Sequence, residues 1–299
     1  MKPPATRTSA SLFKVAAFEK AKVSVVTPSF NQLAYLRLCV ASVADQTGVE
    51  VEHIVQDGGS HGKVSLLLKD KPSVRLFVEA DTGMYDAINR GLRRACGDIC
   101  GYLNCDEQYL PGALAKVAAF FNASQEIDVV FGDIILVDLT GRPLSYRRSI
   151  LPTKDHVQLA HLNTASCATF FRHRLIERGF FFDTKWKAIG DAVWIAQLLS
   201  NGVKMATIRE PLAVFTMTGE NLGASQSSRS EAIAWRNGTN VRRRVRFFFE
   251  ILLHRVRKAL AGAYKLRNVE IQVYTPDSPE QRQTRIGRRI GFSWPRGTT

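Results

Sequence analysis

An acidic segment follows an apolar run in the first half of the chain. Asn104, Cys105, Asp106 and Glu107 come directly after Ile99–Leu103, which has the composition of a buried strand. Carboxylates that emerge together at such a point can hold a hard divalent cation through oxygen ligands, and a diphosphate can supply further oxygens. Mg²⁺ or Mn²⁺ suits this chemistry. A solvated acidic turn would have the same sequence, so this segment alone leaves both interpretations open.

A second carboxylate stands at the end of another short apolar run. Asp57 is followed by Gly58 and Gly59. Its carboxylate could accept the imide N–H of a uracil or a similar base edge, and the glycines permit a tight turn and close backbone approach. The alternative is a turn that leads into a helix N-cap at Ser60.

The stretch from Asp81 to Gly91 carries the densest set of polar residues. Asp86, Asn89 and Arg90 fall at positions i, i+3 and i+4 of a predicted helix, so they share one face. Asp81 and Asp86 frame its start. This face could bind ribose, phosphate or sugar hydroxyls. An exposed helix face with an ordinary Asp–Arg pair is the alternative.

Asp191 begins a later predicted helix, three residues before the apolar Trp194. The helix dipole favours an ionised carboxylate at this place, which suits a general base. The alternative is an N-cap, the more common use of Asp at a helix start.

The elements that would position these residues alternate between strands and helices. The predicted strands are Val23–Thr27, Val51–Val55, Val74–Val78, Ile99–Leu103 and Asp128–Val137, and the helices between them are Tyr35–Val43, Val64–Leu68, Met84–Arg94 and Leu110–Phe121. This order predicts an α/β fold, a mainly parallel sheet with helices on both faces. Ligands bind such sheets beyond the carboxyl ends of the strands, which is where the polar residues described above lie.

Together these segments resemble the inverting glycosyltransferases of family 2, from about Val23 to about Thr218. The strongest matches stand in the family's order and are Val25–Asn31, His53–Ser60, Glu79–Gly91 and Gly101–Glu107. The resemblance implies the GT-A fold, which contains a Rossmann-like nucleotide-binding sheet. Ala168–Arg172 is similar to the family's strand near the acceptor site.

The resemblance also implies roles for individual residues. Pro28 and Phe30 would border the nucleotide base, Asp57 would bind it, and Asp81 would approach the ribose or phosphates. Asn104 and Asp106 would occupy the outer places of the family's DxD motif, with Asp106 as the metal ligand, and Asp191 would be the catalytic base. The full set of expected donor-binding residues is Pro28, Ser29, Phe30, Asp57, Asp81, Asp86, Asn89, Arg90, Asn104 and Cys105.

Two positions depart from the family's pattern. The first DxD position is Asn104 rather than Asp, and Gly190 precedes Asp191 in a segment that lacks the acidic neighbour often found beside the base. These departures keep a second interpretation open, a non-catalytic nucleotide- or sugar-binding module. A nucleotidyltransferase is a further alternative, but it would carry a glycine-rich basic loop where Pro28–Gln32 stands.

The implied activity is a metal-dependent, inverting, hexosyltransferase-type reaction. A sugar would pass from a nucleotide-diphosphate sugar, with a UDP-sugar favoured, to an acceptor hydroxyl in polysaccharide or glycolipid synthesis. The expected cofactor is Mg²⁺ or Mn²⁺, and the expected partners are the donor and a saccharide or lipid-linked acceptor.

Positive charge concentrates after residue 235. Residues 236–299 hold fifteen Lys/Arg against four Asp/Glu, a net charge of +11 out of +14 for the chain. Residues 241–260 predict a basic amphipathic helix, which suits an anionic membrane surface, where each basic residue contributes about 1 kcal/mol. Packing on the catalytic domain is the alternative. No nucleic-acid module is recognised, so nucleic acid is not an expected partner.

The sequence therefore divides into a flexible leader (1–20), a catalytic domain (21–222), a basic helical extension (223–275) and a flexible basic tail (276–299). Five cysteines without a CxxC pair predict no disulfide framework and a reducing compartment, and no paired Cys/His spacing predicts a zinc site. No signal peptide or membrane-spanning run is apparent. The expected location is cytoplasmic, peripheral at the inner face of the membrane.

Overall fold

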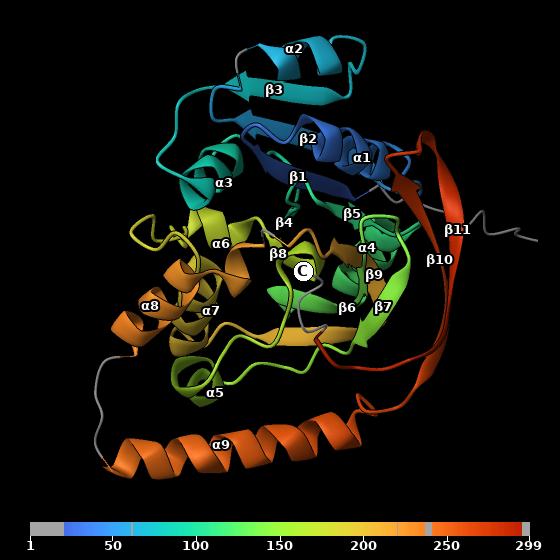
Figure 1. Cartoon of the computed structure of the whole chain (residues 1–299). Coiled ribbons are helices and arrows are strands. Elements are labelled where there is room, and N and C mark those ends of the chain that lie inside the picture. The colour runs from blue at the N-terminus through green and yellow to red at the C-terminus, as the bar shows by residue number, and fades with distance from the viewer. Residues whose placement is uncertain (1–20, 61, 220, 237–240, 295–299) are drawn as a thin grey trace, which may run out of the picture.

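A computed structural model describes residues 21–60, 62–219, 221–236 and 241–294 (Figure 1). The predicted flexible leader, 1–20, lies outside these residues. The described chain forms a curled central sheet of nine strands with helices on both faces, and a separate two-stranded hairpin beside it. The predicted α/β architecture is confirmed.

The half of the sheet built from the first part of the chain is parallel. Its strands lie in the order β3 (Val74–Val78), β2 (Glu50–Asp57), β1 (Lys22–Ser29) and β4 (Ile99–Tyr102). Each pairs in parallel with its neighbour. Their carboxyl ends therefore meet at one edge, as the alternation of strands and helices predicts.

The other half is mixed, so "mainly parallel" describes only the first half. The order continues through β8 (Thr169–Arg172), β6 (Val129–Val137), β9 (Met205–Thr216) and β5 (Glu107–Tyr109), with β7 (Pro143–Arg147) paired to β6. Antiparallel β8 is inserted between β4 and β6, so the chain direction reverses there. Of the pairings in this half, only β6 with β9 is parallel among the described residues.

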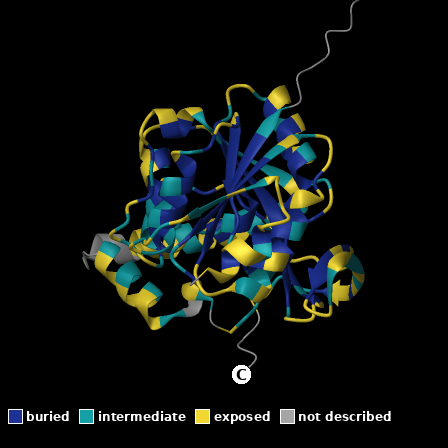
Figure 2. Cartoon of the chain, turned by 90° about the horizontal axis from the view of Figure 1, so that it is seen from above, coloured by how far each residue is buried: buried dark blue, intermediate teal, exposed yellow. Residues whose placement is uncertain are grey.

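Consecutive apolar residues of the strands point to opposite faces and build two cores. Val26 packs in a core with the helices α3 and α7, whereas Val25 packs in one with α1 and α4. Figure 2 shows the buried strands enclosed by helices whose outer faces are exposed. The helices are α1 (Leu33–Ala44), α2 (Lys63–Leu68), α3 (Met84–Leu92), α4 (Ala113–Ala123), α5 (Lys154–Leu159), α6 (Arg174–Glu177), α7 (Gly190–Ser200), α8 (Gln226–Trp235) and α9 (Val241–Leu260), with 3₁₀ turns η1 (Ser166–Ala168) and η2 (Leu222–Ala224).

The final described segment is a β-hairpin, which corrects two predictions. Strands β10 (Arg267–Thr275) and β11 (Ser278–Ile290) pair in antiparallel fashion. The prediction of a flexible tail is therefore wrong for Ser278–Ile290, and the extension before it is not helical throughout, since it ends in β10. The physical reason is packing: Ile271 and Val273 are buried against residues of β6.

Helix α9 runs along the edge of the molecule, next to α5 and away from the sheet (Figure 1). Its outer face keeps large apolar side chains exposed, namely Val245, Phe247, Phe248, Phe249, Leu252, Leu253, Val256 and Leu260. Within the described residues no helix is both long enough and apolar enough to cross a bilayer.

Candidate functional site

The ends of β1, β2 and β3 bring four of the predicted donor-binding residues together. The β1–β2 register pairs Ser29 with Asp57, so Phe30 follows at the same edge with its ring largely exposed. A Cβ atom on Gly58 would lie 2.7 Å from Asp81 Oδ2 and 3.3 Å from the Phe30 ring. Phe30, Gly58 and Asp81 thus form one surface, on which a planar base could lie against the aromatic ring.

Asp57 is held firmly by the turn that follows it. Its Oδ2 accepts the N–H groups of Gly59 (3.1 Å) and Ser60 (2.7 Å), and its Oδ1 accepts the Ser60 hydroxyl at 2.6 Å. The alternative of an N-cap at Ser60 is wrong, because the N-cap of α2 is Gly62. Asp57 is 99% buried beneath the turn, and only its Oδ1 keeps a free lone pair for a ligand, because Oδ2 already accepts two hydrogen bonds.

The loop before α3 is ordered by two carboxylates. Asp81 Oδ1 accepts the N–H of Gly83 at 2.8 Å, and Gly83 has the positive φ of 129° that this turn requires. Asp86 accepts the N–H of Thr82 (3.0 Å) and pairs with Arg90 (3.1 Å). Burial alone would raise the pKa of Asp86, but these hydrogen bonds outweigh it and lower the pKa.

Two expected donor-binding side chains lie inside the protein instead. The Asn89 amide exchanges two hydrogen bonds with the backbone of Phe182, at 2.8 and 2.9 Å, and Asn89 is almost fully buried. The Cys105 thiol is buried and donates to the carbonyl of Pro28 at 3.2 Å. The structure therefore corrects both predictions: Asn89 fixes Phe182 to α3, and Cys105 fixes the acidic turn to β1.

The acidic turn offers oxygen ligands of the kind the sequence predicts. Asn104 Oδ1 is buried and has no hydrogen-bond partner, and the Asp106 carboxylate accepts one bond from the Asn221 amide at 3.2 Å. An amide oxygen and a carboxylate two residues apart fit Mg²⁺ or Mn²⁺, which prefer oxygen donors and leave places for phosphate and water.

Glu107 supports this turn from beneath. Its two oxygens accept the N–H of Asn104 (2.8 Å) and the hydroxyl of Ser166 (3.1 Å). Burial, together with the neighbouring charge of Asp106, raises the pKa of Glu107 to about 8, and burial also raises the pKa of Asp106. The paired carboxyls thus hold a proton near neutrality, which a bound cation would displace.

Asp191 lies in the first turn of α7 but does not cap it, since the N-cap is Ile189 and no side chain caps the helix. Its Oδ1 accepts the backbone N–H of Ala192 (2.8 Å) and the hydroxyl of Tyr85 (3.3 Å). Burial raises the pKa of Asp191, although these hydrogen bonds oppose the rise. A partly exposed carboxylate with a raised pKa can accept a proton from a hydroxyl.

Several residues of the site carry no expectation from the sequence. Tyr85 links α3 to Asp191, and its position beside Asp86 is the signal that could have found it. The Lys187 ammonium donates to the carbonyl of Thr82 at 2.7 Å and so places a cation beside the Asp81 loop. Asn221 contacts Asp106 from 115 residues away, and no local pattern marks it.

Comparison with known proteins finds similarity to glycosyltransferases. The model of the family described as Glycosyl transferase family 2 matches residues 24–179. A PGL/p-HBAD biosynthesis glycosyltransferase of Mycobacterium tuberculosis is 35% identical over 119 residues, which cover 38% of this chain and 46% of the relative, so the match spans about half of that protein. An uncharacterized M. tuberculosis glycosyltransferase is 30% identical over 208 residues, 66% of this chain and 76% of the relative.

Two solved structures share the fold. TarS of Staphylococcus aureus (residues 1–349) in complex with UDP-GlcNAc superposes with a TM-score of 0.55 at 20% identity, covering 68% of this chain and 61% of that one. The mannosyltransferase PcManGT of Pyrobaculum calidifontis in complex with GDP-Man and Mn²⁺ superposes with a TM-score of 0.55 at 17% identity, covering 80% and 70%.

Proposed function

Because this chain belongs to glycosyltransferase family 2, we propose that it transfers a sugar from a nucleotide-diphosphate sugar, preferably a UDP-sugar, to an acceptor hydroxyl with inversion. The observation that carries the proposal is that the surface at the strand ends is linked through α3 to the Asp191 carboxylate. Phe30, Asp57 and Asp81 line the strand ends, and Tyr85, four residues after Asp81, holds Asp191 by a hydrogen bond.

The proposed reaction is a single displacement. Asp191 takes the proton of the acceptor hydroxyl while its oxygen attacks the anomeric carbon, and the bond from that carbon to the diphosphate oxygen breaks. The nucleoside diphosphate leaves from the opposite side, which inverts the anomeric configuration. Tyr85 orients the base, and the raised pKa of Asp191 makes it a better proton acceptor.

The cation has a defined place in this proposal. Asn104 and Asp106 would hold Mg²⁺ or Mn²⁺, and the bound ion would neutralise charge on the departing diphosphate. Asn221 positions Asp106 through its amide, and Glu107 fixes the turn from the protein side. A structure of the related fold carries Mn²⁺ with its GDP-sugar, which supports the same cofactor class here.

The donor site is tested first by thermal-shift measurements with UDP, dTDP, GDP, ADP and CMP, each with and without Mn²⁺. We expect one diphosphate to raise the melting temperature, with most of the rise dependent on metal. Asp106→Asn should remove the metal-dependent part. The absence of a shift with every nucleotide would contradict the donor site.

Catalysis is tested separately from binding. Asp191→Asn should keep the nucleotide-induced thermal shift and lower turnover by about 10²- to 10⁴-fold, the usual contribution of a general base. Turnover can be followed as release of nucleoside diphosphate from the donor that binds. Unchanged turnover in this variant would remove Asp191 from the mechanism, and binding without any turnover in the parent chain would favour the non-catalytic module.

We further propose that α9 holds the enzyme at an anionic membrane surface, where a lipid-linked or surface-polysaccharide acceptor is available. Phe248 is 66% exposed, Phe249 62% and Leu260 83%, and basic residues accompany them along the helix. Exposed aromatic side chains beside Lys and Arg suit the interface between headgroups and acyl chains. This would place the protein as a peripheral enzyme on the cytoplasmic leaflet.

Vesicle flotation with the double variant Phe248→Ser/Phe249→Ser tests this attachment. Removal of 236–299 is a poorer test, because it also removes β10 and β11, which pack on the sheet. The double variant should lose most binding to vesicles that contain anionic lipid. The matched control is Ile233→Ser, which changes a 70% exposed side chain on α8. Equal flotation of all three proteins would exclude α9 as the contact.

A further inference from the structure

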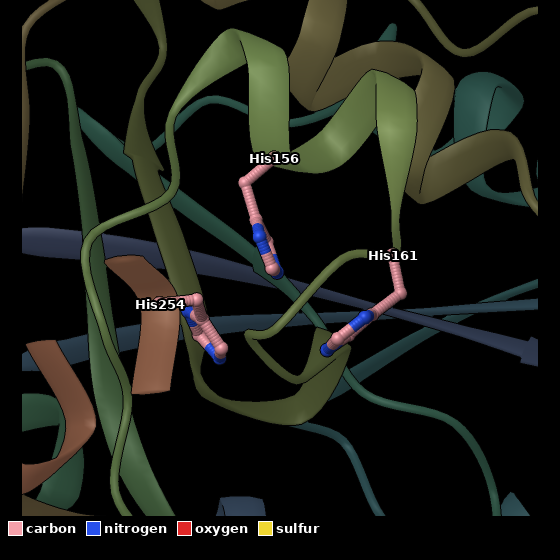
Figure 3. Close-up of side chains that lie close together, drawn as sticks. All are labelled: His156, His161 and His254. Carbon is pink, nitrogen blue, oxygen red and sulfur yellow. The ribbon is translucent and has the colours of Figure 1, made fainter. Parts of the chain in front are cut away.

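Three histidines from two separate segments meet between α5 and α9. Figure 3 shows His156 on α5 and His161 just after it, both directed towards His254 of α9. A ring nitrogen from each lies within 4.8 Å of the others. The His156 and His254 rings stack with centroids 4.1 Å apart, and His161 lies across them. None of these residues belongs to the donor site.

The hydrogen bonding of this histidine cluster is incomplete. Both ring nitrogens of His156 are buried and neither makes a hydrogen bond of normal geometry, although the backbone of Glu250 lies close enough to raise the pKa of the ring slightly. Buried polar atoms normally have partners, and two orphaned nitrogens on one ring need an explanation. Glu250, one turn before His254 on α9, also has a buried carboxylate oxygen without a partner. The cluster therefore contains ligand atoms and a carboxylate without the group that would satisfy them.

The protonation state of the three rings suits metal coordination. Burial lowers the pKa of His156 to about 4 and that of His254 to about 3, and it lowers the pKa of His161 as well. All three imidazoles are therefore neutral at pH 7, the form that binds a metal ion. The cluster also has an entry path, because His161 is exposed while the other two are buried.

The surrounding charges restrict which ion can bind. Arg147, Arg236, Arg257 and Lys258 lie close enough to lower the histidine pKa values, and one oxygen of Glu250 on α9 is buried without a hydrogen-bond partner. Such surroundings oppose a hard cation held mainly by charge, such as Mg²⁺. They are tolerable for an ion that forms strong bonds to nitrogen, and three imidazoles are a common ligand set for zinc.

We propose that His156, His161 and His254 form a transition-metal site, best suited to Zn²⁺, that fastens α9 to the catalytic domain. Tetrahedral zinc with bonds of about 2.0–2.1 Å would bring the nitrogens to roughly 3.4 Å apart, a movement of about 1–1.5 Å that side-chain rotation can supply. A solvent molecule would take the fourth position. The salt bridge of Arg246 with Asp155 (2.8 Å) already joins the same two helices.

The metal would fix the orientation of the exposed apolar face of α9. Helix α9 contacts α5, but the large apolar side chains on its outward face remain exposed. Occupancy would thus set how firmly the membrane-facing helix is held. The spacing of His156 and His161 suits a ligand pair, but the third histidine, His254, follows His161 by more than ninety residues, so the sequence alone does not reveal the complete site.

The test is a Zn²⁺ titration of the full chain, free of any histidine tag and stripped with a chelator, by calorimetry or competition with a chromophoric chelator. The Asp106→Asn background separates this site from the cation site for the donor. We expect one Zn²⁺ per chain, and we expect His161→Ala and His254→Ala each to weaken binding by at least about tenfold. His173→Ala, which changes a histidine outside the cluster, is the matched control and should bind as the parent does.

Three further measurements separate loss of the metal site from loss of the fold. Because His161 is exposed, His161→Ala should keep the parent's circular dichroism, and Co²⁺ in the parent should give the visible absorption of a tetrahedral nitrogen site. Hydrogen exchange should show α9 better protected with Zn²⁺ than without it. The proposal is overturned if Zn²⁺ does not bind, if binding survives both histidine variants, or if binding leaves the exchange of α9 unchanged. Each of these outcomes is independent of sugar transfer.

Discussion

Tyr85 connects the two halves of the candidate site at the level of single residues. Its hydroxyl donates to Asp191 at 3.3 Å, and its ring stacks on Phe182 with centroids 5.3 Å apart. Phe182 is in turn held by the Asn89 amide. The residue before Asp191 has to be glycine, because a Cβ atom on Gly190 would lie 2.6 Å from the Tyr85 ring. The departure from the family's pattern beside Asp191 thus has a steric cause.

Tyr85→Phe should alter the pH dependence of activity. The Tyr85 hydroxyl lowers the pKa of Asp191, so its removal raises that pKa. The base is protonated and inactive below its pKa, and the acidic limb of the kcat/KM profile should therefore move to higher pH. The profile of Tyr264→Phe, distant from the site, should match the parent. An unshifted acidic limb in Tyr85→Phe would show that this hydrogen bond does not govern the base.

Gly190→Ala should displace the Tyr85 ring. The added methyl group overpacks a tight contact, which typically costs about 1–3 kcal/mol of folding free energy, and a misplaced base costs on the order of tenfold or more in kcat/KM. Thermal melts and steady-state kinetics measure the two effects. Gly223→Ala adds a methyl group in open space and serves as the control. Full activity in Gly190→Ala would contradict the packing argument.

The buried Glu107 should make stability depend on pH. Its pKa is raised from about 4.5 in the unfolded chain to about 8. The folded state therefore keeps a proton that the unfolded state loses, and stability should fall by roughly 1 kcal/mol per pH unit between these values. Its contribution is complete below pH 4.5 and is lost once the pH has risen through 8.

Chemical denaturation at pH 6, 7, 8 and 9, with a chelator present, measures this loss. Glu107→Gln should lack this part of the pH dependence, because its amide can meet both Asn104 and Ser166 without titrating. Glu126→Gln changes an exposed carboxyl and should behave as the parent does. Parallel pH profiles for the parent and Glu107→Gln would refute the raised pKa.

Residue positions were predictable wherever a strand end determined them. Asp57 and Asp81 stand together because parallel strands end at one edge, which the alternation of elements reveals. The side-chain directions of Asn89 and Cys105 were not predictable, because they depend on Phe182 and Pro28, distant along the chain. The same holds for Asn221, whose contact with Asp106 depends on where η2 packs.

At the scale of elements, the hairpin β10–β11 braces the strand that carries Glu107. The Gln108 side chain both donates to the carbonyl of Tyr274 and accepts its N–H, each at 2.9 Å, as a neighbouring strand would. The Arg282 guanidinium pairs with Asp45 at the end of α1, at 2.7 Å for one contact. Tyr274 and Asp106 also line one small cavity. The position of the acidic turn therefore depends on the hairpin.

Gln108→Ala should loosen this brace. It leaves a buried backbone N–H and carbonyl of Tyr274 unpaired, which costs about 1–3 kcal/mol for each such group. We expect lower thermal stability, faster hydrogen exchange in β10 and weaker metal-dependent donor binding. The matched variant Gln272→Ala truncates an exposed glutamine in the hairpin itself. Equal exchange rates in β10 for both variants would show that Gln108 is not the attachment.

The hairpin is also where the sequence misleads. Most residues of β11 are polar or basic, and they are exposed or half-buried, so the strand lacks the apolar alternation that identifies a half-buried strand from sequence. It is an edge strand whose stability comes from backbone pairing with β10 and from Arg282. Composition therefore predicts a tail, whereas tertiary contacts produce a strand.

At the scale of the whole molecule, charge and exposed apolar surface lie on the same part of the chain. The net charge of +14 comes mainly from residues after 235, and that region also contains the exposed apolar face of α9. If α9 binds an anionic surface as proposed, a basic, apolar helix on one edge would orient the molecule relative to that surface. Such an orientation would fix the position of the donor site relative to the same surface.

Binding to anionic vesicles should weaken as salt rises. The electrostatic part is screened over about 10 Å at 0.1 M salt and about 3 Å at 1 M, whereas apolar insertion is not. Flotation at 0.05, 0.15 and 0.5 M NaCl should fall steadily but remain above that of Phe248→Ser/Phe249→Ser at each concentration. Binding that is independent of salt, or equal for neutral and anionic vesicles, would contradict an electrostatic contribution.

The pairing of Gln108 with Tyr274 also affects the order in which parts of the site form during synthesis of the chain. The two residues are 166 positions apart, and at 5–20 residues per second a ribosome needs roughly ten to thirty seconds to advance from one to the other. During that interval β1, β2 and β3, whose ends form the surface for the nucleotide base, can already pair. The acidic turn still lacks its contact with the β10–β11 hairpin. A nascent chain should thus form the surface for the nucleotide base well before it can bind the diphosphate through a cation at the acidic turn. Activity should therefore begin only after the hairpin has emerged.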